Sequence, residues 1–266
     1  MVKVIAHRGA RSIAPENTLI AAKLAYEIGA DLWGTDVNVT RDNHLILFHD
    51  ETLLRCTNAE TRFPSRQSYR VKDFYLKDIM ALNAGSFFNE TDPFLQIVKG
   101  NVSSKALSLY KKETIPTLKQ GLLFTKKMNW KVNLELKRFV YGTCDTLLPD
   151  KTLETIYQCG ISLDLVVVSS FSHEWLERIR IKEPRIEVQA LVGENDNDSL
   201  DFGELEFETY NVNANLVNLN QIKLLKDKGK RINLFTVNDP KIFSRFENHG
   251  VDGIFTDFPQ LFSKKV

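Results

Sequence analysis

The sequence predicts a single (β/α)8 barrel, in which eight parallel strands are surrounded by helices, over residues 1–266. Strand signals and helical patterns alternate along almost the whole chain. Outside one long insertion the strand signals number eight, which is the number that closes such a barrel. The chain length of 266 residues also fits the roughly 250 residues that are typical of this fold.

The first strand–helix–strand unit lies at the N-terminus. An apolar run, Val2–Ala6, predicts a buried strand that ends at the sequence His-Arg-Gly. Apolar residues then recur at helical spacing over Thr18–Ile28, and a glycine follows to end the helix. A second apolar run, Leu32–Val39, comes directly after it. A strand, a helix and a strand in so short a stretch indicate a right-handed crossover between parallel strands.

Six further strands and five further helices continue the same pattern. The strands are predicted at Lys131–Leu136, Leu165–Ser170, Val188–Val192, Ala214–Val217, Ile232–Val237 and Gly253–Thr256. The helices are predicted at Leu118–Met128, Lys151–Gln158, His173–Ile181, Asn220–Lys228 and Lys241–Asn248.

Residues 40–115 interrupt this alternation and predict a small subdomain inserted between the second strand and the second helix. The stretch is rich in charged residues, Asn, Ser and isolated aromatic residues, and it is too long for an ordinary barrel loop. It begins with an edge-type strand, Leu45–Phe48, that ends at His49 and Asp50. Because long structured loops at the barrel mouth usually shape a binding site, we expect the insertion to lie over that mouth.

Composition excludes a bulk electrostatic attraction to nucleic acid or to an anionic membrane. The 35 Lys and Arg residues nearly balance the 34 Asp and Glu residues, which leaves a formal charge of +1. No apolar run approaches the roughly 20 residues that span a bilayer, so no stable membrane insertion is expected. The chain enters a strand directly without a signal-peptide pattern, which predicts a cytoplasmic protein, or a mature form whose leader has been removed. The expected partner is a small molecule, and the sequence does not define an oligomeric state.

The three cysteines, Cys56, Cys144 and Cys159, lack metal-type spacing and are expected to be free thiols.

Chemically reactive side chains gather where the predicted strands end. His7, Asp36 and Glu135 fall at the C-terminal ends of barrel strands, which is where barrel enzymes place their active sites. A second imidazole, that of His49, enters the same region from the insertion. The remaining histidines, His44, His173 and His249, are expected to be surface or structural residues.

This combination of groups suits one reaction above others. A pair of carboxylates can hold a hard divalent cation, and the side chains of Arg8 and Lys137 can bind phosphate oxygens. Two imidazoles can then act as base and acid on opposite sides of a phosphorus atom. The site residues therefore predict cleavage of a phosphodiester.

These residues lie in motifs that resemble those of the glycerophosphodiester phosphodiesterase family, and the resemblance covers nearly the whole chain. The matching motifs are His7-Arg8-Gly9, Pro15-Glu16-Asn17-Thr18, Gly29-Ala30-Asp31, Asp36-Val37, His49-Asp50, Glu135-Leu136-Lys137, Ser169-Ser170-Phe171, Thr236-Val237-Asn238 and the run from Asp252 to Pro259. The resemblance implies hydrolysis of a glycerophosphodiester to glycerol 3-phosphate and an alcohol, with a bound Mg²⁺ or Ca²⁺ ion.

The resemblance also implies a role for each site residue. These roles are acid–base catalysis by His7 and His49, metal binding by Asp36 and Glu135, and substrate binding by Arg8, Lys137 and Glu16. Glu16 has a structural alternative, because a carboxylate near a helix N-terminus is stabilised by the helix dipole. The sequence leaves open which histidine is the base, whether water or the neighbouring glycerol hydroxyl attacks, and which alcohol is released.

One position departs from the family pattern. The family carries a metal-binding Glu two residues before the Asp of the second strand, whereas this chain has Gly34 two residues before Asp36. Side chains alternate along a strand, so the missing carboxylate would have stood beside that of Asp36. A glycine within a strand is locally unfavourable, which indicates a replacement, natural or introduced, of another residue.

Two hypotheses follow from Gly34. The protein is an active or weakened phosphodiesterase, or it is a catalytically silent relative that binds a phosphodiester without cleaving it. An unrelated barrel enzyme such as an aldolase is disfavoured, because neither a Schiff-base lysine context nor a glycine-rich phosphate loop follows the last two predicted strands.

Overall fold

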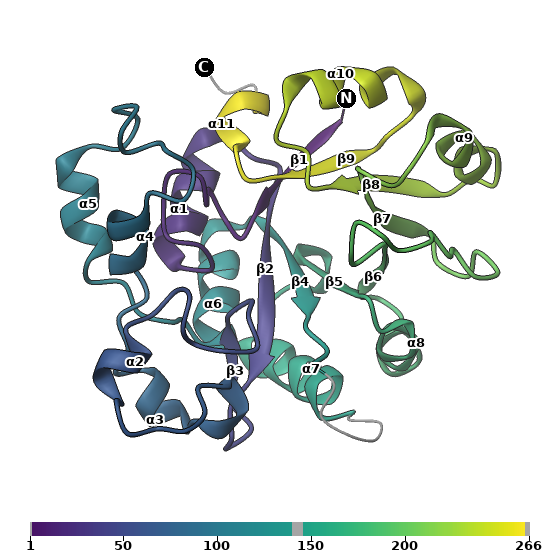
Figure 1. Ribbon diagram of the computed structural model, residues 1–266. Coiled ribbons are helices and arrows are strands. Elements are labelled where there is room, and N and C mark those ends of the chain that lie inside the picture. The colour runs from purple at the N-terminus through teal and green to yellow at the C-terminus, as the bar shows by residue number, and fades with distance from the viewer. Residues whose placement is uncertain (1, 140–145, 264–266) are drawn as a thin grey trace.

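The computed structural model describes residues 2–139 and 146–263, and its centre is a closed barrel of parallel strands (Figure 1). The strands of the barrel are β1 (Lys3–His7), β2 (Leu32–Val39), β4 (Lys131–Leu136), β5 (Val166–Ser170), β6 (Glu187–Val192), β7 (Thr209–Asn213), β8 (Arg231–Phe235) and β9 (Gly253–Thr256). Around the barrel they follow the order β1, β9, β8, β7, β6, β5, β4 and β2, and the pairing of β1 with β2 closes the ring. The predicted (β/α)8 barrel is confirmed.

Helices surround this barrel on its outside (Figure 1). They are α1 (Leu19–Ile28), α6 (Leu118–Met128), α7 (Leu147–Cys159), α8 (His173–Lys182), α9 (Leu219–Asp227), α10 (Pro240–Phe246) and α11 (Pro259–Phe262), with single 3-10 turns η2 (Leu163–Leu165) and η3 (Glu247–His249). Side chains fix where they begin: capping boxes formed by Thr117 with Gln120 and by Asn218 with Gln221 start α6 and α9. None of the helices in the described residues is long and apolar enough to cross a membrane.

The sixth predicted strand was wrong. The strand β7 occupies Thr209–Asn213, and the predicted segment, Ala214–Val217, lies in the turn that follows it. The sequence of β7 alternates apolar residues with polar ones such as Asn211, whose side chain is buried and bonded to Asn233. Because polar side chains face the barrel interior here, the strand lacks the continuous apolar run expected of a parallel strand.

Smaller differences concern element ends. The helix α7 begins at Leu147 rather than at Lys151, because Pro149 is tolerated in the first turn of a helix. The strand β8 ends at Phe235, two residues earlier than predicted.

Cys56 and Cys159 are buried free thiols, while Cys144 lies outside the described residues.

The segment between β2 and α6 begins with β3 (Leu45–Leu47), which pairs antiparallel with β2. It continues through short helical pieces, α2 (Ala59–Arg62), η1 (Val71–Asp73), α3 (Leu76–Ile79), α4 (Ser86–Thr91) and α5 (Ser104–Tyr110). One hydrophobic cluster, which includes Phe74 and Ile79, belongs to this segment alone. A second cluster packs Phe88 and Tyr110 against Ala21 of α1, and the Tyr110 hydroxyl donates to the carbonyl oxygen of Ile13 at 2.8 Å. The segment is therefore packed against the loop that follows β1 (Figure 1).

Candidate active site

A pocket of about 340 Å³ lies at the C-terminal ends of the barrel strands. It brings together five of the seven side chains that the sequence singled out. The residues that line it are His7, Arg8, His49, Glu135, Lys137, Phe171, Leu191, Glu194, Asn195, Phe235, Thr236 and Phe255. The other two predicted residues, Glu16 and Asp36, are buried behind this lining.

Strand register explains why the site residues converge. Asp36 of β2 and Glu135 of β4 are directly paired across the parallel strands. His7, at the end of β1, is paired in the same way with Gly34 of β2. Side chains at paired positions of neighbouring strands project on the same side of a sheet, so these residues face one end of the barrel interior.

His7 is oriented by a carboxylate from the end of the chain. Its Nδ1 atom lies 2.7 Å from Oδ1 of Asp257, and the other carboxylate oxygen, Oδ2, accepts a hydrogen bond from Asn238 at 2.8 Å. Burial of Asp257 raises the pKa of its carboxyl, but the charge and hydrogen bond of His7 outweigh this and lower it overall. An ionised carboxylate can only accept, so Nδ1 of His7 donates and its Nε2 atom is left with a lone pair.

Burial also lowers the pKa of the His7 imidazole below 6.5, and the nearby charge of Arg8 lowers it further. The charge of Asp257 acts in the opposite direction but does not compensate. The imidazole is therefore neutral at neutral pH and able to accept a proton at Nε2.

His49 is oriented in the same way by its neighbour in the sequence. Its Nδ1 atom lies 2.6 Å from Oδ1 of Asp50. Burial raises the pKa of Asp50, yet hydrogen bonds from His49 and Arg55 outweigh this and bring it to about 2. On the opposite side of the ring, Nζ of Lys137 lies 3.3 Å from Nε2 of His49 and donates to Oε1 of Glu135 at 2.9 Å.

A buried carboxylate, that of Glu16, connects these groups. It accepts hydrogen bonds from Arg8 at 2.8 Å, from Arg11 at 2.9 Å and from two nitrogens of Arg55 at 2.8 and 3.0 Å. The Arg55 guanidinium also donates to both oxygens of Asp50, at 2.6 and 2.9 Å. Because Asp50 in turn holds His49, Glu16 links the phosphate-binding candidate Arg8 to the second histidine.

Sequence reasoning missed three members of this network, Arg11, Arg55 and Asp257. Asp257 lies in the closing motif directly after β9, so its position at a strand end was a usable signal. Arg11 contacts Asp257 across 246 residues, and Arg55 contacts Glu16 across 39 residues. Neither pairing leaves a local pattern in the sequence.

The carboxylates of Asp36 and Glu135 are the groups suited to a metal ion. Burial raises the pKa of Asp36, but the charges of Arg8, His49 and Lys137 outweigh it, so the group is ionised. One oxygen of Asp36 accepts from Asn17 at 2.8 Å and lies 3.2 Å from Nε of Arg8. Within residues 2–139 and 146–263 no set of three or more His, Cys, Asp or Glu side chains is placed to hold a metal. A pair of carboxylates fits Mg²⁺, which is commonly bound by one or two carboxylates together with water and a substrate phosphate.

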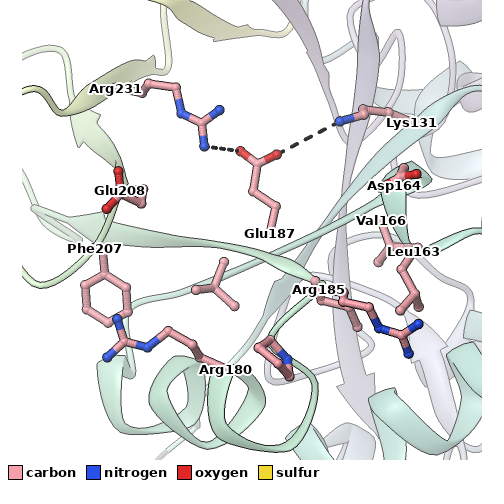
Figure 2. A pocket seen from close by; sticks show the side chains of 13 residues that line it. Lys131, Leu163, Asp164, Val166, Arg180, Arg185, Glu187, Phe207, Glu208 and Arg231 are labelled. Carbon is pink, nitrogen blue, oxygen red and sulfur yellow. Dashed lines mark ion pairs between the residues drawn. The ribbon is translucent and has the colours of Figure 1, made fainter.

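A second pocket, of about 350 Å³, lies at the opposite end of the barrel, near the N-terminal ends of β4, β5 and β6. Its charged groups neutralise each other: Figure 2 shows Glu187 between Arg231, at 3.2 Å, and Lys131, at 4.0 Å. Barrel enzymes place their chemistry at the C-terminal ends of the strands, so the first pocket is the candidate active site.

Residues 7–261 match the model of the glycerophosphoryl diester phosphodiesterase family. Together with the fold, this match defines the class of the molecule, which is a phosphoric diester hydrolase built on a (β/α)8 barrel. The chain therefore belongs to that family.

Individual relatives and solved structures agree with this assignment. A glycerophosphodiester phosphodiesterase of Bacillus subtilis is 30% identical over 99% of this chain and 86% of its own length. A glycerophosphoinositol inositolphosphodiesterase of mouse is 32% identical over 97% of this chain, which spans only 46% of the mouse protein. The structure of an Oleispira antarctica phosphodiesterase in complex with the product sn-glycerol-3-phosphate superposes with a TM-score of 0.78, 25% identity and coverage of 97% and 94% of the two chains.

Proposed function

We propose that the protein hydrolyses glycerophosphodiesters to glycerol 3-phosphate and an alcohol by acid–base catalysis with two histidines. The observation that carries this proposal is the shared geometry of His7 and His49. Each imidazole lines the same pocket, and each is held through Nδ1 by a carboxylate, that of Asp257 or of Asp50. The name of the Bacillus subtilis relative and the product bound to the Oleispira antarctica enzyme support the substrate class.

In this proposal His7 is the base. Its buried ring is neutral at neutral pH and exposes a lone pair at Nε2, so it takes the proton of the nucleophile. His49 then donates a proton to the leaving oxygen. Nζ of Lys137 lies 3.3 Å from Nε2 of His49. A substrate phosphate would compete for this ammonium group and leave Nε2 free to carry the proton.

Arg8 and Lys137 bind the phosphate and offset its charge as it redistributes in the transition state. Asp36 and Glu135 would hold the divalent cation, Mg²⁺ or Ca²⁺, as expected for a family whose enzymes generally use one. When bound, such an ion withdraws charge from a non-bridging phosphate oxygen and makes phosphorus more open to attack.

Glu16 acts on Arg8 rather than on the substrate. Its side chain is only 7% exposed, it does not line the pocket, and its oxygens are taken up by three arginines. Residues 40–115 serve as a functional insertion, because they supply His49, Asp50 and Arg55 to the site.

The alternative function is binding without cleavage, and Gly34 is the observation that favours it. The deciding experiment incubates the purified protein with glycerophosphocholine or glycerophosphoglycerol in Mg²⁺ or Ca²⁺ and measures glycerol 3-phosphate with a coupled dehydrogenase assay. We expect product formation that the His49→Ala variant loses. Saturable binding by calorimetry without any product would instead establish the silent relative.

A further inference from the structure

The pocket is divided chemically into two sides. On one side stand the ends of β1 and β4 and the loop after β3, which provide His7, Arg8, His49, Glu135 and Lys137. The other side is built from the ends of β5, β6, β8 and β9, which belong to the arc of the ring that runs from β5 through β6, β7 and β8 to β9, the neighbour of β1 (Figure 1). The first side suits the phosphate of a diester, so the second side faces whatever is attached to that phosphate.

Aromatic rings dominate this second side. Phe171, directly after β5, and Phe235, at the end of β8, meet edge to face with ring centroids 5.9 Å apart. Phe255 of β9 and Leu191 of β6 extend the same wall. Aromatic faces carry partial negative charge and attract cations, and quaternary ammonium groups in particular, within about 6 Å of the ring centroid.

Glu194 is the charged side chain among the described residues that line this aromatic side. It lies in the loop after β6, which is anchored on both sides of it. Asn213, at the end of β7, donates to the carbonyl oxygen of Gly193 and to Oδ1 of Asp196, each at 3.1 Å. Gly193 has φ +83°, and a Cβ there would lie 2.9 Å from Leu200 and from Leu216, so the turn requires glycine.

The carboxylate of Glu194 is itself uncommitted. It makes no hydrogen bond or ion pair with any residue in the described ranges, whereas the nearby Asp196 accepts from Asn213 and Asn215. An exposed glutamate on a loop is ordinarily only a solvated surface residue. Glu194 differs because its loop is fixed and because it stands at a pocket whose opposite side carries the positive charge.

We propose that this aromatic side, with Glu194, binds a cationic head group, so that the preferred substrates are glycerophosphodiesters of an amino alcohol such as choline or ethanolamine. This inference rests on the proposed function. The order of charges in the pocket, cationic at Arg8 and Lys137 and anionic at Glu194, is complementary to a zwitterion with a phosphate and an ammonium group. The face of an aromatic ring attracts a cation without forming hydrogen bonds. Such a surface therefore suits an ammonium group better than it suits a polyol.

A polyol head group such as inositol or glycerol requires several donors and acceptors for its hydroxyl groups. The polar residues on the aromatic side are few, namely Glu194, Asn195 and Thr236. The volume of about 340 Å³ is also at the small end of ligand pockets, which favours a compact head group.

The test compares kcat/KM for glycerophosphocholine, glycerophosphoethanolamine, glycerophosphoglycerol and glycerophosphoinositol in the parent, Glu194→Gln and Phe171→Leu proteins. We expect the parent to favour the two cationic substrates by about tenfold or more. Glu194→Gln should lose most of that preference while its rate with glycerophosphoglycerol changes less than about twofold. The matched control is Glu204→Gln, which removes an exposed carboxylate outside the pocket lining and should change neither rate.

The proposal is overturned if the parent prefers glycerophosphoinositol or glycerophosphoglycerol, or if Glu194→Gln leaves the substrate preference unchanged. Failure of the proposed function has a different signature, since none of the four diesters would then be cleaved. Calorimetric titration of glycerophosphocholine and glycerophosphoglycerol into His7→Ala and His7→Ala/Glu194→Gln proteins separates the two cases. A choline preference that disappears with Glu194 would support head-group recognition even in a protein without hydrolysis, and equal binding of both diesters would refute it.

Discussion

Gly34 lies against the ring of Phe255. A Cβ atom built on Gly34 would stand 3.4 Å from Cε1 and 3.6 Å from Cδ1 of that ring. The backbone of Gly34 does not have the positive φ that would require glycine, since it is absent from the positive-φ residues of the described chain. The backbone conformation therefore does not require glycine at position 34. The ring of Phe255 lies beside the space that a larger side chain would enter.

Gly34→Glu should strengthen the metal site. The new carboxylate would stand next to Asp36, and a third negative ligand increases the affinity for a hard cation. A Cβ atom at position 34 would make ordinary van der Waals contact with the ring of Phe255, at 3.4 Å, so its addition does not require the ring to move. We expect tighter binding of Mg²⁺ or Ca²⁺ by calorimetry and hydrolysis at least about tenfold faster at limiting cation.

The control for this change is Gly34→Gln, which has the same shape without the charge. If both variants bind the cation as the parent does, the vacancy at position 34 is already compensated and the weakening of the site is refuted. Combining Gly34→Glu with Phe255→Leu tests whether the ring limits the gain.

His7→Ala and His49→Ala should each reduce kcat by about 10²- to 10⁴-fold, which is the usual contribution of a general acid or base. Both side chains line an open pocket, so their loss leaves no core cavity and far-ultraviolet circular dichroism should be unchanged. His44→Ala provides the comparison, because the His44 side chain is 55% exposed and its ion pair with Asp42 lies outside the pocket lining. Parent-like rates in either active-site variant would rule out the two-histidine mechanism.

Arg55→Ala should lower kcat about tenfold with a smaller change in KM, because Arg55 positions Asp50 and Glu16 without lining the pocket. Its side chain is 45% exposed, and the buried carboxylate of Glu16 keeps its ion pairs with Arg8 and Arg11, so the loss of Arg55 should cost little stability. Arg55→Lys, which cannot bridge both carboxylates with a planar fork, should recover only part of the rate.

A purely structural role of Arg55 would give a different result. It would lower the unfolding temperature and leave kcat of the folded protein and its pH profile unchanged. A shift of the pH profile in Arg55→Ala, measured at saturating substrate, would indicate that the contact acts through the Asp50–His49 pair.

The pH dependence should follow His7. Its pKa is lowered on folding from 6.5, chiefly by burial, so the base form persists below the range in which an exposed histidine would protonate. The acid limb of kcat/KM should therefore lie below pH 6.5 and shift when Asp257→Asn removes the carboxylate.

The same shift has a consequence for stability. Between the folded pKa and 6.5 the unfolded chain binds a proton at His7 that the folded protein does not bind, so this contribution to stability is complete above 6.5 and is lost as the pH falls. Urea unfolding at pH 5 to 7 should show a smaller decline for His7→Gln than for the parent. An equal decline in both proteins would mean that His7 does not titrate in this way.

The sequence by itself determined the barrel and the residues at its mouth. Apolar runs and helical periodicity are local signals. His7 ends such a run, and Asp36 and Glu135 lie in the C-terminal halves of two others, so their placement towards the barrel mouth was predictable. The strand β7 was misplaced because its interior-facing Asn211 replaces the apolar residue that the pattern expects.

Only the tertiary structure decided how these groups are partnered. The carboxylate that orients His7 comes from Asp257, 250 residues away, and the guanidinium that ties Glu16 to Asp50 comes from the insertion. The tertiary structure likewise places Glu194 in the same pocket as Phe171 and Phe235, which come from the ends of different strands. Such contacts arise because the barrel closes on itself and brings together strand ends that are distant in the chain, which no local periodicity encodes.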